Sequence, residues 1–205
     1  MTIHKTPIIR TAARWLALFF LKCNGWQIQG DRPDIPKYVM IAAPHTSNWD
    51  FIYALAISFV YRINILTMMK DAWFFWPLGP IFRWLGAIPI DRRKSHKVVD
   101  QMIAAFHRST EMILMVPPSG TRKKVLYWKT GFYRIANGAG VPIAMGYLDY
   151  RLKRGGIGPV FHPTGDLDQD LKTIQKFYHD ITGKHPCQSI QIPVVQKRHS
   201  GRSVS

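Results

Sequence analysis

Five short apolar runs, separated by amphipathic segments and turn residues, constrain the fold of this chain more than any other feature. The runs occupy residues 38–43, 64–69, 87–90, 112–116 and 142–148. Each is shorter than a typical helix and rich in aliphatic residues, as buried strands are. Helical patterns lie between several of them, over residues 51–60, 95–108 and 130–139. This order predicts an α/β fold, a single layered domain whose central mixed, largely parallel sheet is flanked by helices.

The length of 205 residues is sufficient for one domain with a sizeable core. We expect an N-terminal amphipathic helix within residues 1–30, the main domain over residues 31–185, and a basic tail over residues 186–205. The tail is rich in Lys, Arg, Ser and Gly and has little apolar periodicity.

The N-terminal helix is predicted over residues 8–26, where basic side chains accompany the apolar run 15–21. That run is far shorter than the roughly 20 apolar residues that cross a bilayer. The helix is therefore expected to lie on a membrane surface or, as the alternative, to pack as an ordinary helix of the domain. Basic residues interrupt the stretch, so a cleavable signal peptide is not indicated.

The charge balance is strongly positive, with 28 Lys and Arg against 12 Asp and Glu and a net charge of +16. Such a surface attracts nucleic acid, anionic lipids, phosphorylated substrates or acidic carrier proteins. The chain has neither zinc-ligand cysteine spacing nor an aromatic RNA-binding signature, so no specific nucleic-acid partner is predicted. Clustering of aromatic with aliphatic residues favours a membrane. The two cysteines, Cys23 and Cys187, indicate a reducing compartment.

An aromatic segment over residues 72–86 is interrupted by Pro77 and Pro80 and cannot form one regular helix. Three interpretations remain open. The segment lines a site for a lipid chain, it forms a surface that enters a bilayer, or it is a buried helix-turn-helix corner of the core.

His45 and Asp50 form the pattern with the clearest chemical meaning. If residues 38–43 are a strand and a helix begins near Ser47 or Asn48, His45 lies on the turn and Asp50 in the first helical turn, within hydrogen-bonding reach. A histidine oriented by a carboxylate serves as a general base for a hydroxyl. No Gly-x-Ser-x-Gly nucleophile is present, so the hydroxyl is expected on the substrate. The spacing often arises by chance, and a helix cap is the alternative.

Two basic turns also follow predicted strands. Residues 116–124 place main-chain N–H groups, Thr121 and three consecutive cations at the end of the strand 112–116, a suitable pocket for a phosphate. Residues 88–94 again end an apolar run with cations. Open α/β sheets hold ligands at the carboxyl ends of their strands, so these turns and His45 are consistent with one site. A solvated basic loop is the alternative for each turn.

Together these motifs resemble those of the glycerol-phosphate and lysophospholipid acyltransferase superfamily. They occur in the family's order and cover roughly residues 37–150. The matching segments are His45 to Asp50 with their neighbours (HTSNWDF), Arg92 in IDRR, Gly120-Thr121-Arg122 (GTR), and Val141-Pro142-Ile143 (VPI). One departure is Ser119, which stands where the family has a glutamate, and the sequence has one glutamate, Glu111, before this motif.

The resemblance implies transfer of a fatty acyl group from acyl-coenzyme A or acyl carrier protein to a hydroxyl of a glycerol phosphate or lysophospholipid, with 1-acyl-sn-glycerol 3-phosphate the expected acceptor in phospholipid biosynthesis. His45 would be the base and Asp50 its orienting group. The expected substrate-binding residues are Arg92, Ser119, Gly120, Thr121 and Arg122. No metal and no cofactor beyond the acyl co-substrate is expected.

The same resemblance implies a protein bound peripherally to an anionic membrane surface, at the cytoplasmic face of a bacterial inner membrane. Ser119 opens two alternatives. The acceptor is not a glycerophosphate, or the chain is a catalytically weakened, lipid-binding protein that keeps the acyltransferase scaffold.

Overall fold

The computed structural model describes residues 7–91 and 95–188. The strands are β1 (Gln27–Gln29), β2 (Lys37–Ala43), β3 (Ile65–Lys70), β4 (Ala87–Ile90), β5 (Met112–Val116), β6 (Ile143–Asp149) and β7 (Arg154–Phe161). The α-helices are α1 (Pro7–Cys23), α2 (Trp49–Tyr61), α3 (Leu78–Trp84), α4 (Ser95–Arg108), α5 (Gly131–Ala139) and α6 (Leu167–Tyr178). Two 3₁₀ turns, η2 (Asp71–Trp73) and η4 (Pro186–Gln188), complete the described elements.

The strands form a seven-stranded sheet in the order β1-β7-β6-β2-β5-β3-β4. Strands β6, β2, β5, β3 and β4 run parallel, whereas β7 is antiparallel to β6 and carries β1 parallel to itself. This confirms the predicted mixed, largely parallel sheet in an α/β domain. Because five strands share one direction, their carboxyl ends meet at one edge of the sheet. His45, just after β2, and the loop after β5 both lie at this edge.

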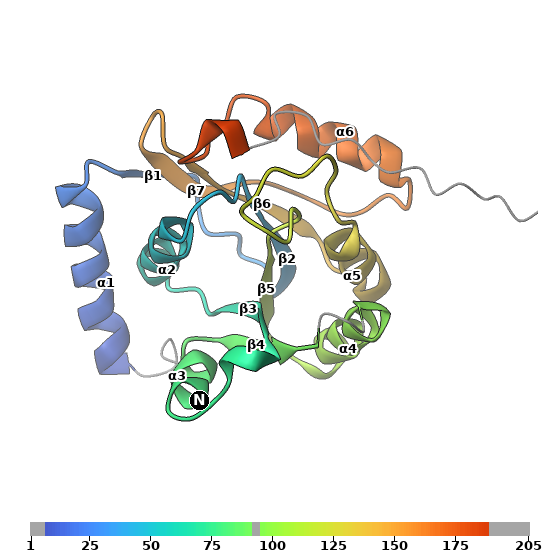
Figure 1. Cartoon of the computed structure of the whole chain (residues 1–205), viewed down its shortest axis with the longest axis horizontal. Helices are drawn as coiled ribbons and strands as arrows, with labels where there is room; N and C mark the ends of the chain where they lie inside the picture. The colour runs from blue at the N-terminus through green and yellow to red at the C-terminus, as the bar shows by residue number, and fades with distance from the viewer. Residues whose placement is uncertain (1–6, 92–94, 189–205) are drawn as a thin grey trace, which may run out of the picture.

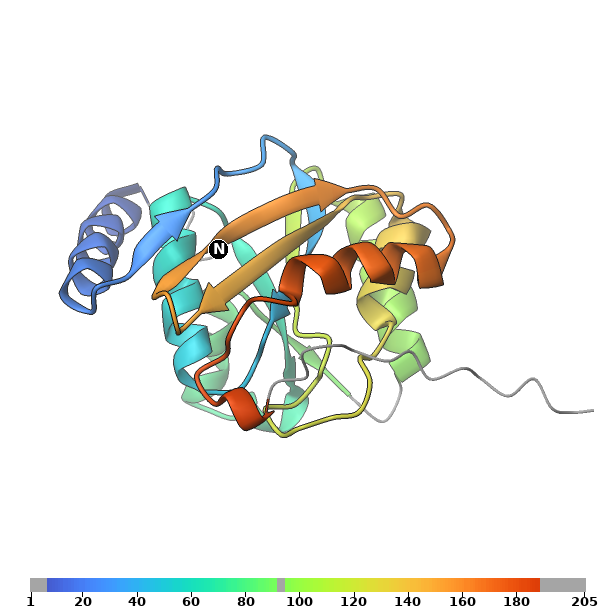
Figure 2. The ribbon, with the colours of Figure 1, turned by 90° about the horizontal axis from the view of Figure 1, so that it is seen from above.

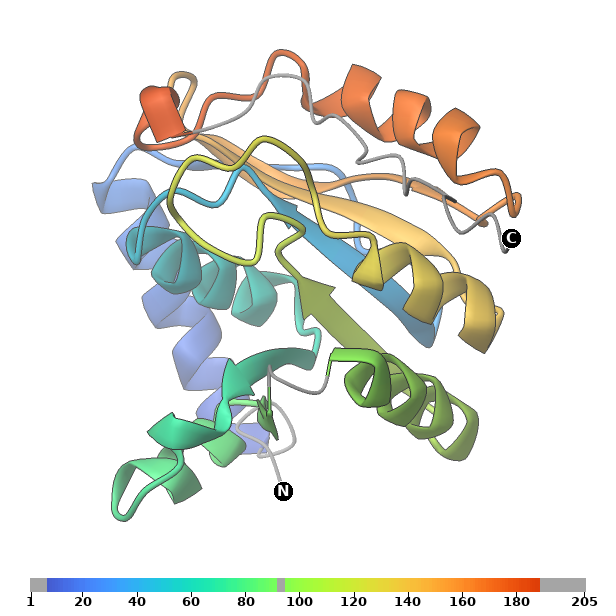
Figure 3. The same ribbon diagram turned by 45° about the vertical axis from the view of Figure 1, so that its right-hand side comes forward.

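Helices cover both faces of the sheet (Figures 1 and 3). Side chains alternate along β2, so Val39 and Ile41 join a core with α4, α5 and α6, while Tyr38 and Met40 join the opposite core. On that second side α2 lies against the sheet, and α1 packs outside α2 (Figure 1). Five predicted strands and three predicted helices are confirmed, with ends that differ by one or two residues.

Strand β7 was not predicted, because its glycines are atypical of a strand interior. The structure shows why they are needed. A Cβ at Gly156 would overlap the carbonyl oxygen of Gln29 in β1, and one at Gly158 would overlap the ring of Phe177 in α6. The first approach lets β1 pair with β7 within the sheet, although the residues of β1 fall in the segment expected as a separate N-terminal helix, and the second lets α6 pack on β7.

Helix α1 has two apolar faces. Ala17 and Leu21 are buried against α2, whereas Trp15, Leu16 and Phe19 are 65–68% exposed. The helix thus packs on the domain and still presents apolar side chains outward. No helix among residues 7–91 and 95–188 is long and apolar enough to cross a membrane.

The aromatic segment over residues 72–86 forms η2 and α3 and projects from the β4 end of the sheet (Figure 3). Most of its large side chains are exposed, so the interpretation as a buried corner of the core is wrong. Trp73 and Phe82 also line a cavity.

Candidate active site

The turn between β2 and α2 holds His45 and Asp50 in direct contact. His45 follows the carboxyl end of β2, and Asp50 lies in the first turn of α2. The Nδ1 atom of His45 lies 3.0 Å from Oδ2 of Asp50. The same oxygen accepts from the main-chain N–H groups of Thr46 at 2.8 Å and Ser47 at 2.9 Å. One carboxylate oxygen therefore fastens the turn and the imidazole together.

The second oxygen of Asp50 is held by a residue that is distant in the sequence but follows the neighbouring strand of the sheet. The Tyr150 hydroxyl donates to Oδ1 of Asp50 at 2.7 Å. Tyr150 follows the end of β6, which neighbours β2, and its N–H donates to the carbonyl oxygen of Thr182. The sequence analysis assigned no role to Tyr150. Its place directly after a strand at the ligand-binding edge was the signal that could have identified it.

Hydrogen bonding decides the charge state of this site. Burial by itself raises the pKa of Asp50, but bonds from His45, Tyr150, Ser47 and Thr46 favour the ionised form, and the resulting pKa lies below its usual value. Burial and the bond to Asp50 raise the pKa of Tyr150 far above its usual value. Asp50 is thus an anion, and Tyr150 is a neutral donor to it.

The imidazole of His45 is oriented for proton transfer. A carboxylate at Nδ1 favours the tautomer that carries its proton there, which leaves the lone pair on Nε2. His45 and Asp50 both line a cavity of about 670 Å³ that also reaches Arg122. The arrangement can remove a proton from a hydroxyl in this cavity and stabilise the imidazolium that forms.

The cavity lies between α2 and the sheet, and its walls are mainly apolar. Its lining includes Met40, Ala54, Ile57, Ile63, Met115, Leu148 and Ile157. Its volume is in the range of about 300–1,000 Å³ typical of small-molecule sites. A long apolar group therefore has space beside the polar edge where His45 lies.

The loop after β5 carries the predicted phosphate-binding residues. Gly120 has a φ of +64°, a conformation that favours glycine, and its N–H donates to the carbonyl oxygen of Pro117. Ser119 donates its hydroxyl to the carbonyl oxygen of Thr121 at 2.7 Å, and the Thr121 hydroxyl accepts from the N–H of Lys123. Both hydroxyls thus organise the loop itself.

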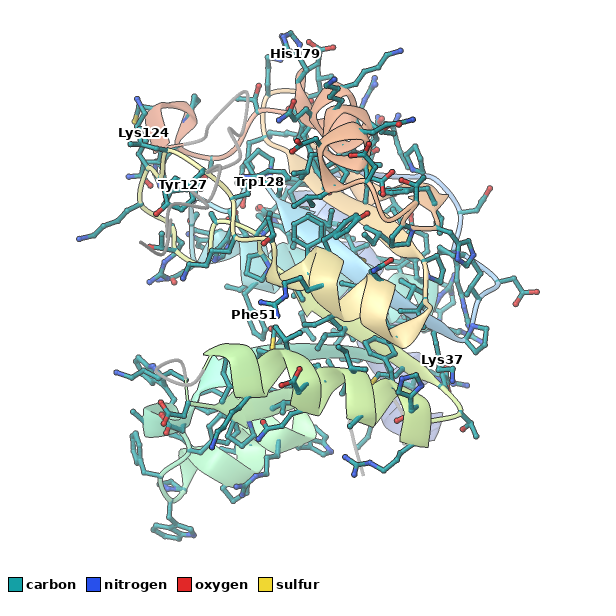
Figure 4. All side chains as sticks on the ribbon, turned by 90° about the vertical axis from the view of Figure 1, so that its right-hand side faces the viewer. Lys37, Phe51, Lys124, Tyr127, Trp128 and His179 are labelled. Atoms are coloured by element: carbon teal, nitrogen blue, oxygen red, sulfur yellow. The ribbon has the colours of Figure 1, made fainter. Side chains whose placement is uncertain are left out.

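The three consecutive cations of this loop, residues 122–124, are exposed, and Arg122 among them also borders the cavity. Figure 4 shows Lys124 and Tyr127 on the outer side of the loop, with Trp128 lying inward, where it is buried. The side chain of Lys129 lies beside Gly120, close enough that a Cβ there would approach its Nζ to 3.2 Å. Lys129 is a cation at this loop that the sequence analysis did not single out.

The C-terminal segment packs across both halves of the site. The N–H of His185 donates to the Thr46 hydroxyl at 3.2 Å. When its amide nitrogen faces the two loops, Gln188 donates to the main-chain oxygens of Thr46 at 3.2 Å and Arg122 at 2.9 Å. Figure 2 shows η4, in red, beside the yellow loop after β5. Gln188, expected in a basic tail, thus joins the turn that carries His45 to the basic loop. Residues 189–205 lie outside the described ranges.

The structure brings together part of the predicted site. Arg122 lines the same cavity as His45 and Asp50, and Ser119 borders a small hollow with His45. Gly120 and Thr121 shape the loop without lining that cavity. Arg92 lies outside the described residues, so its predicted role stays a prediction. Residues 7–91 and 95–188 contain no group of three or more His, Cys, Asp and Glu side chains placed to hold a metal ion.

Comparisons with known proteins concern the family and the fold. A family model described as Acyltransferase matches residues 28–146. A search of curated proteins finds no match. A solved structure, the 1-acyl-sn-glycerophosphate (LPA) acyltransferase PlsC from Thermotoga maritima, superposes with a TM-score of 0.58 at 14% identity, over 82% of this chain and 76% of that one. At this identity, the likeness concerns the fold.

Proposed function

The chain belongs to the acyltransferase family, and on that premise we propose that it transfers a fatty acyl group from a thioester to a hydroxyl of a glycerol phosphate or lysophospholipid. The preferred acceptor in this proposal is 1-acyl-sn-glycerol 3-phosphate. One observation carries the proposal. The His45–Asp50 pair faces an apolar cavity whose lining also includes the cation Arg122.

The proposed reaction is a direct transfer without a covalent acyl-enzyme. Nε2 of His45 takes the proton of the acceptor hydroxyl as its oxygen attacks the thioester carbonyl carbon. The tetrahedral intermediate collapses, its carbon–sulfur bond breaks, and the thiolate leaves with the proton that His45 took. Asp50 stabilises the intervening imidazolium. Because Thr46 and Ser47 already donate their N–H groups to Asp50, other donors must stabilise the oxyanion.

The acceptor side of the site rests on the loop after β5. In the proposal Arg122 pairs with the acceptor phosphate, and Gly120 lets the main chain approach it. Ser119 contributes no charge here, and its hydroxyl is engaged within the loop. A loop that lacks the family's carboxylate presents a more positive surface to an anionic acceptor, a feature that Ser119→Glu would reverse.

The donor is proposed to be acyl-coenzyme A or acyl carrier protein, with the acyl chain in the apolar cavity. No metal or further cofactor is part of the proposal. The working surface is proposed to be an anionic membrane at the cytoplasmic face, in agreement with the net charge of +16.

A direct assay tests this function. Purified protein is incubated with labelled palmitoyl-coenzyme A and, separately, lysophosphatidate, glycerol 3-phosphate and lysophospholipids without a free phosphate, and the labelled lipid is identified. We expect a product that carries a free phosphate group, and a repeat with palmitoyl carrier protein identifies the preferred thioester. Acylation of only the lysophospholipids that lack a free phosphate group would overturn 1-acyl-sn-glycerol 3-phosphate as the preferred acceptor. Donor binding without any product would instead support the lipid-binding alternative.

Ser119→Glu in the same assay tests the departure from the family pattern. We expect its acceptor profile to shift among the phosphate-bearing acceptors while His45-dependent turnover persists. Ser119→Ala is the matched control, because it removes the hydroxyl without adding charge. Identical profiles for all three proteins would exclude this position as a determinant of acceptor choice.

A further inference from the structure

The segment formed by η2 and α3 presents a concentrated apolar surface. Trp73, Phe75, Trp76, Ile81 and Trp84 are between 38% and 84% exposed, and we name these five side chains the aromatic patch. They lie within a stretch of fewer than fifteen residues: Trp73 ends η2, Phe75 and Trp76 lie on the connection, and Ile81 and Trp84 lie in α3. Exposed apolar groups at this density mark an interaction surface.

We propose that the aromatic patch is a membrane-contact surface that inserts into the interfacial region of an anionic bilayer. Tryptophan and phenylalanine are the side chains that interfacial segments bury at the boundary of headgroups and acyl chains. This proposal names the surface through which the proposed enzyme meets its lipid substrates. The membrane contact itself does not depend on the proposed function; only the path of the lipid chain from the patch into the cavity rests on it.

Charges at the patch favour a lipid surface. Lys70 and Arg83 are exposed at the two ends of the segment, and the guanidinium carbon of Arg83 lies 5.4 Å from the ring centroid of Phe74. The ring of Phe74 is half-buried, but Arg83 directly precedes the exposed Trp84, and Lys70 lies three residues before the exposed Trp73. Cations among exposed aromatic side chains match a layer of anionic headgroups above acyl chains.

The patch also adjoins the cavity of the site. Trp73 belongs to both, and Lys70 and Phe82 from the same segment line the cavity as well. The cavity extends from these residues to His45. A lipid chain resting on the patch therefore has a short lateral path into the apolar space beside the catalytic pair.

A second apolar surface lies at the same end of the molecule. Figure 1 shows α3 and the N-terminal end of α1 on the same, lower side of the molecule, and Trp15, Leu16 and Phe19 of α1 are exposed. Leu85, directly after α3, packs on the same core cluster as α1. Contact of both surfaces with the bilayer would bury more apolar area than contact of either alone. Separate variants of α1 and of the aromatic patch measure what each contributes to membrane binding.

The test is vesicle flotation of the whole chain with double variants. Phe75→Ser/Trp76→Ser removes two patch side chains that do not line the cavity, and Leu126→Ser/Tyr127→Ser removes a consecutive exposed pair from the loop after β5. Vesicles contain phosphatidylcholine alone or with about one third phosphatidylglycerol. We expect the wild type and the loop variant to bind the anionic vesicles, and the patch variant to lose at least about tenfold in partitioning.

Three further readouts keep the proposal distinct from its rivals. Transfer between a short-chain, water-soluble donor and glycerol 3-phosphate should be unchanged in the patch variant, so lost membrane binding is separated from lost catalysis. An equal loss of vesicle binding in the patch and loop variants would overturn the proposal. The proposal would also fail if Trp15→Ser/Phe19→Ser abolished vesicle binding and the patch variant did not reduce it. Analytical ultracentrifugation gives a further test. A wild-type protein that is a dimer and a patch variant that is a monomer would also overturn the proposal, because the patch would then contact a second copy of the chain.

Discussion

Two His–Asp pairs of this protein have almost the same local geometry and very different surroundings. Nδ1 of His45 lies 3.0 Å from Asp50, and Nδ1 of His179 lies 2.9 Å from Asp180. The side chains of the first pair are 26% and 7% exposed, and those of the second are 63% and 86% exposed. Figure 4 shows His179 projecting from the end of α6, apart from the loop that carries Lys124.

The two pairs have similar His–Asp distances and differ in burial and in the further hydrogen bonds of the carboxylate, and these differences make His45 the candidate base. Asp50 accepts three further hydrogen bonds, from Thr46, Ser47 and Tyr150, which fix it in an ionised, oriented state. Asp180 sits in solvent, where such a pair contributes little and holds no fixed orientation. His45 also lines an apolar cavity, whereas His179 does not. The second pair is therefore a built-in control for the first.

The largest contrast is expected from removing each imidazole. His45→Ala should lower kcat for acyl transfer by up to about 10⁴-fold, because the general base is lost. His179→Ala should leave kcat within about twofold, because exposed pairs contribute little. Steady-state kinetics with circular dichroism as a folding check measures both. Activity of His45→Ala near the wild-type level would break the comparison.

The next effect is expected from removing one charge of each pair. Asp50→Asn should keep the fold and lower kcat by about 10³-fold, because the amide neither stabilises the imidazolium nor enforces the Nδ1–H tautomer. Asp180→Asn should have no measurable effect on kcat. Equal kcat values for the two variants would mean that burial of the carboxylate has no catalytic consequence.

Arg122→Ala tests a cation that lines the cavity beside the His45–Asp50 pair. We expect the KM for a phosphate-bearing acceptor to rise by about 10- to 100-fold, because a charge-assisted contact is lost. The KM for the acyl donor should change little. Lys124→Ala, also exposed on this loop, is the control and should raise the acceptor KM less. An unchanged acceptor KM in Arg122→Ala would remove this residue from the phosphate site.

The smallest effect is expected from Tyr150→Phe, which removes one hydrogen bond to Asp50 and keeps the ring. We expect a fall in kcat of about tenfold or less and a loss of about 1–2 kcal/mol in the free energy of unfolding at pH 7. Tyr127→Phe, at an exposed loop position, is the control and should match the wild type in both measurements.

The pH dependence of that stability loss gives a second check. Because the pKa of Asp50 is lowered in the folded state, its ionisation contributes stability above the unfolded pKa, and this contribution is lost as pH falls through the folded pKa. Tyr150→Phe removes one of the hydrogen bonds that lower the pKa of Asp50 in the folded state, so this pKa moves closer to that of the unfolded state. Urea titrations should therefore show a gap between variant and wild type that is present at neutral pH and shrinks in acid. A gap independent of pH would assign Tyr150 to packing alone.

The contact between His45 and Asp50 could be predicted because its parts are local. His45 and Asp50 are five residues apart on a strand-turn-helix segment, and strand and helix patterns are properties of short stretches. The loop after β5 was placed near this turn for a similar reason, since the ends of parallel strands share one edge. Strand β7 was missed, because its glycines serve contacts with Gln29 and Phe177 that no local pattern contains.

Residues that complete the site come from distant parts of the chain. Tyr150 is 100 positions from Asp50, and Gln188 joins Thr46 to Arg122 from the C-terminal segment. Neither contact follows from periodicity or spacing, because each depends on which strands become neighbours and how the last helix returns over the sheet.

By itself the sequence determined the α/β class, most strands, and the identity and spacing of the histidine and carboxylate, because these follow from side-chain periodicity and from contacts between residues a few positions apart. Only the tertiary structure decided that Tyr150 locks Asp50, that an apolar cavity opens beside His45, and that the aromatic segment is exposed. Those features depend on the strand order of the sheet and on which surfaces its helices leave uncovered, and both are set by packing across the whole domain.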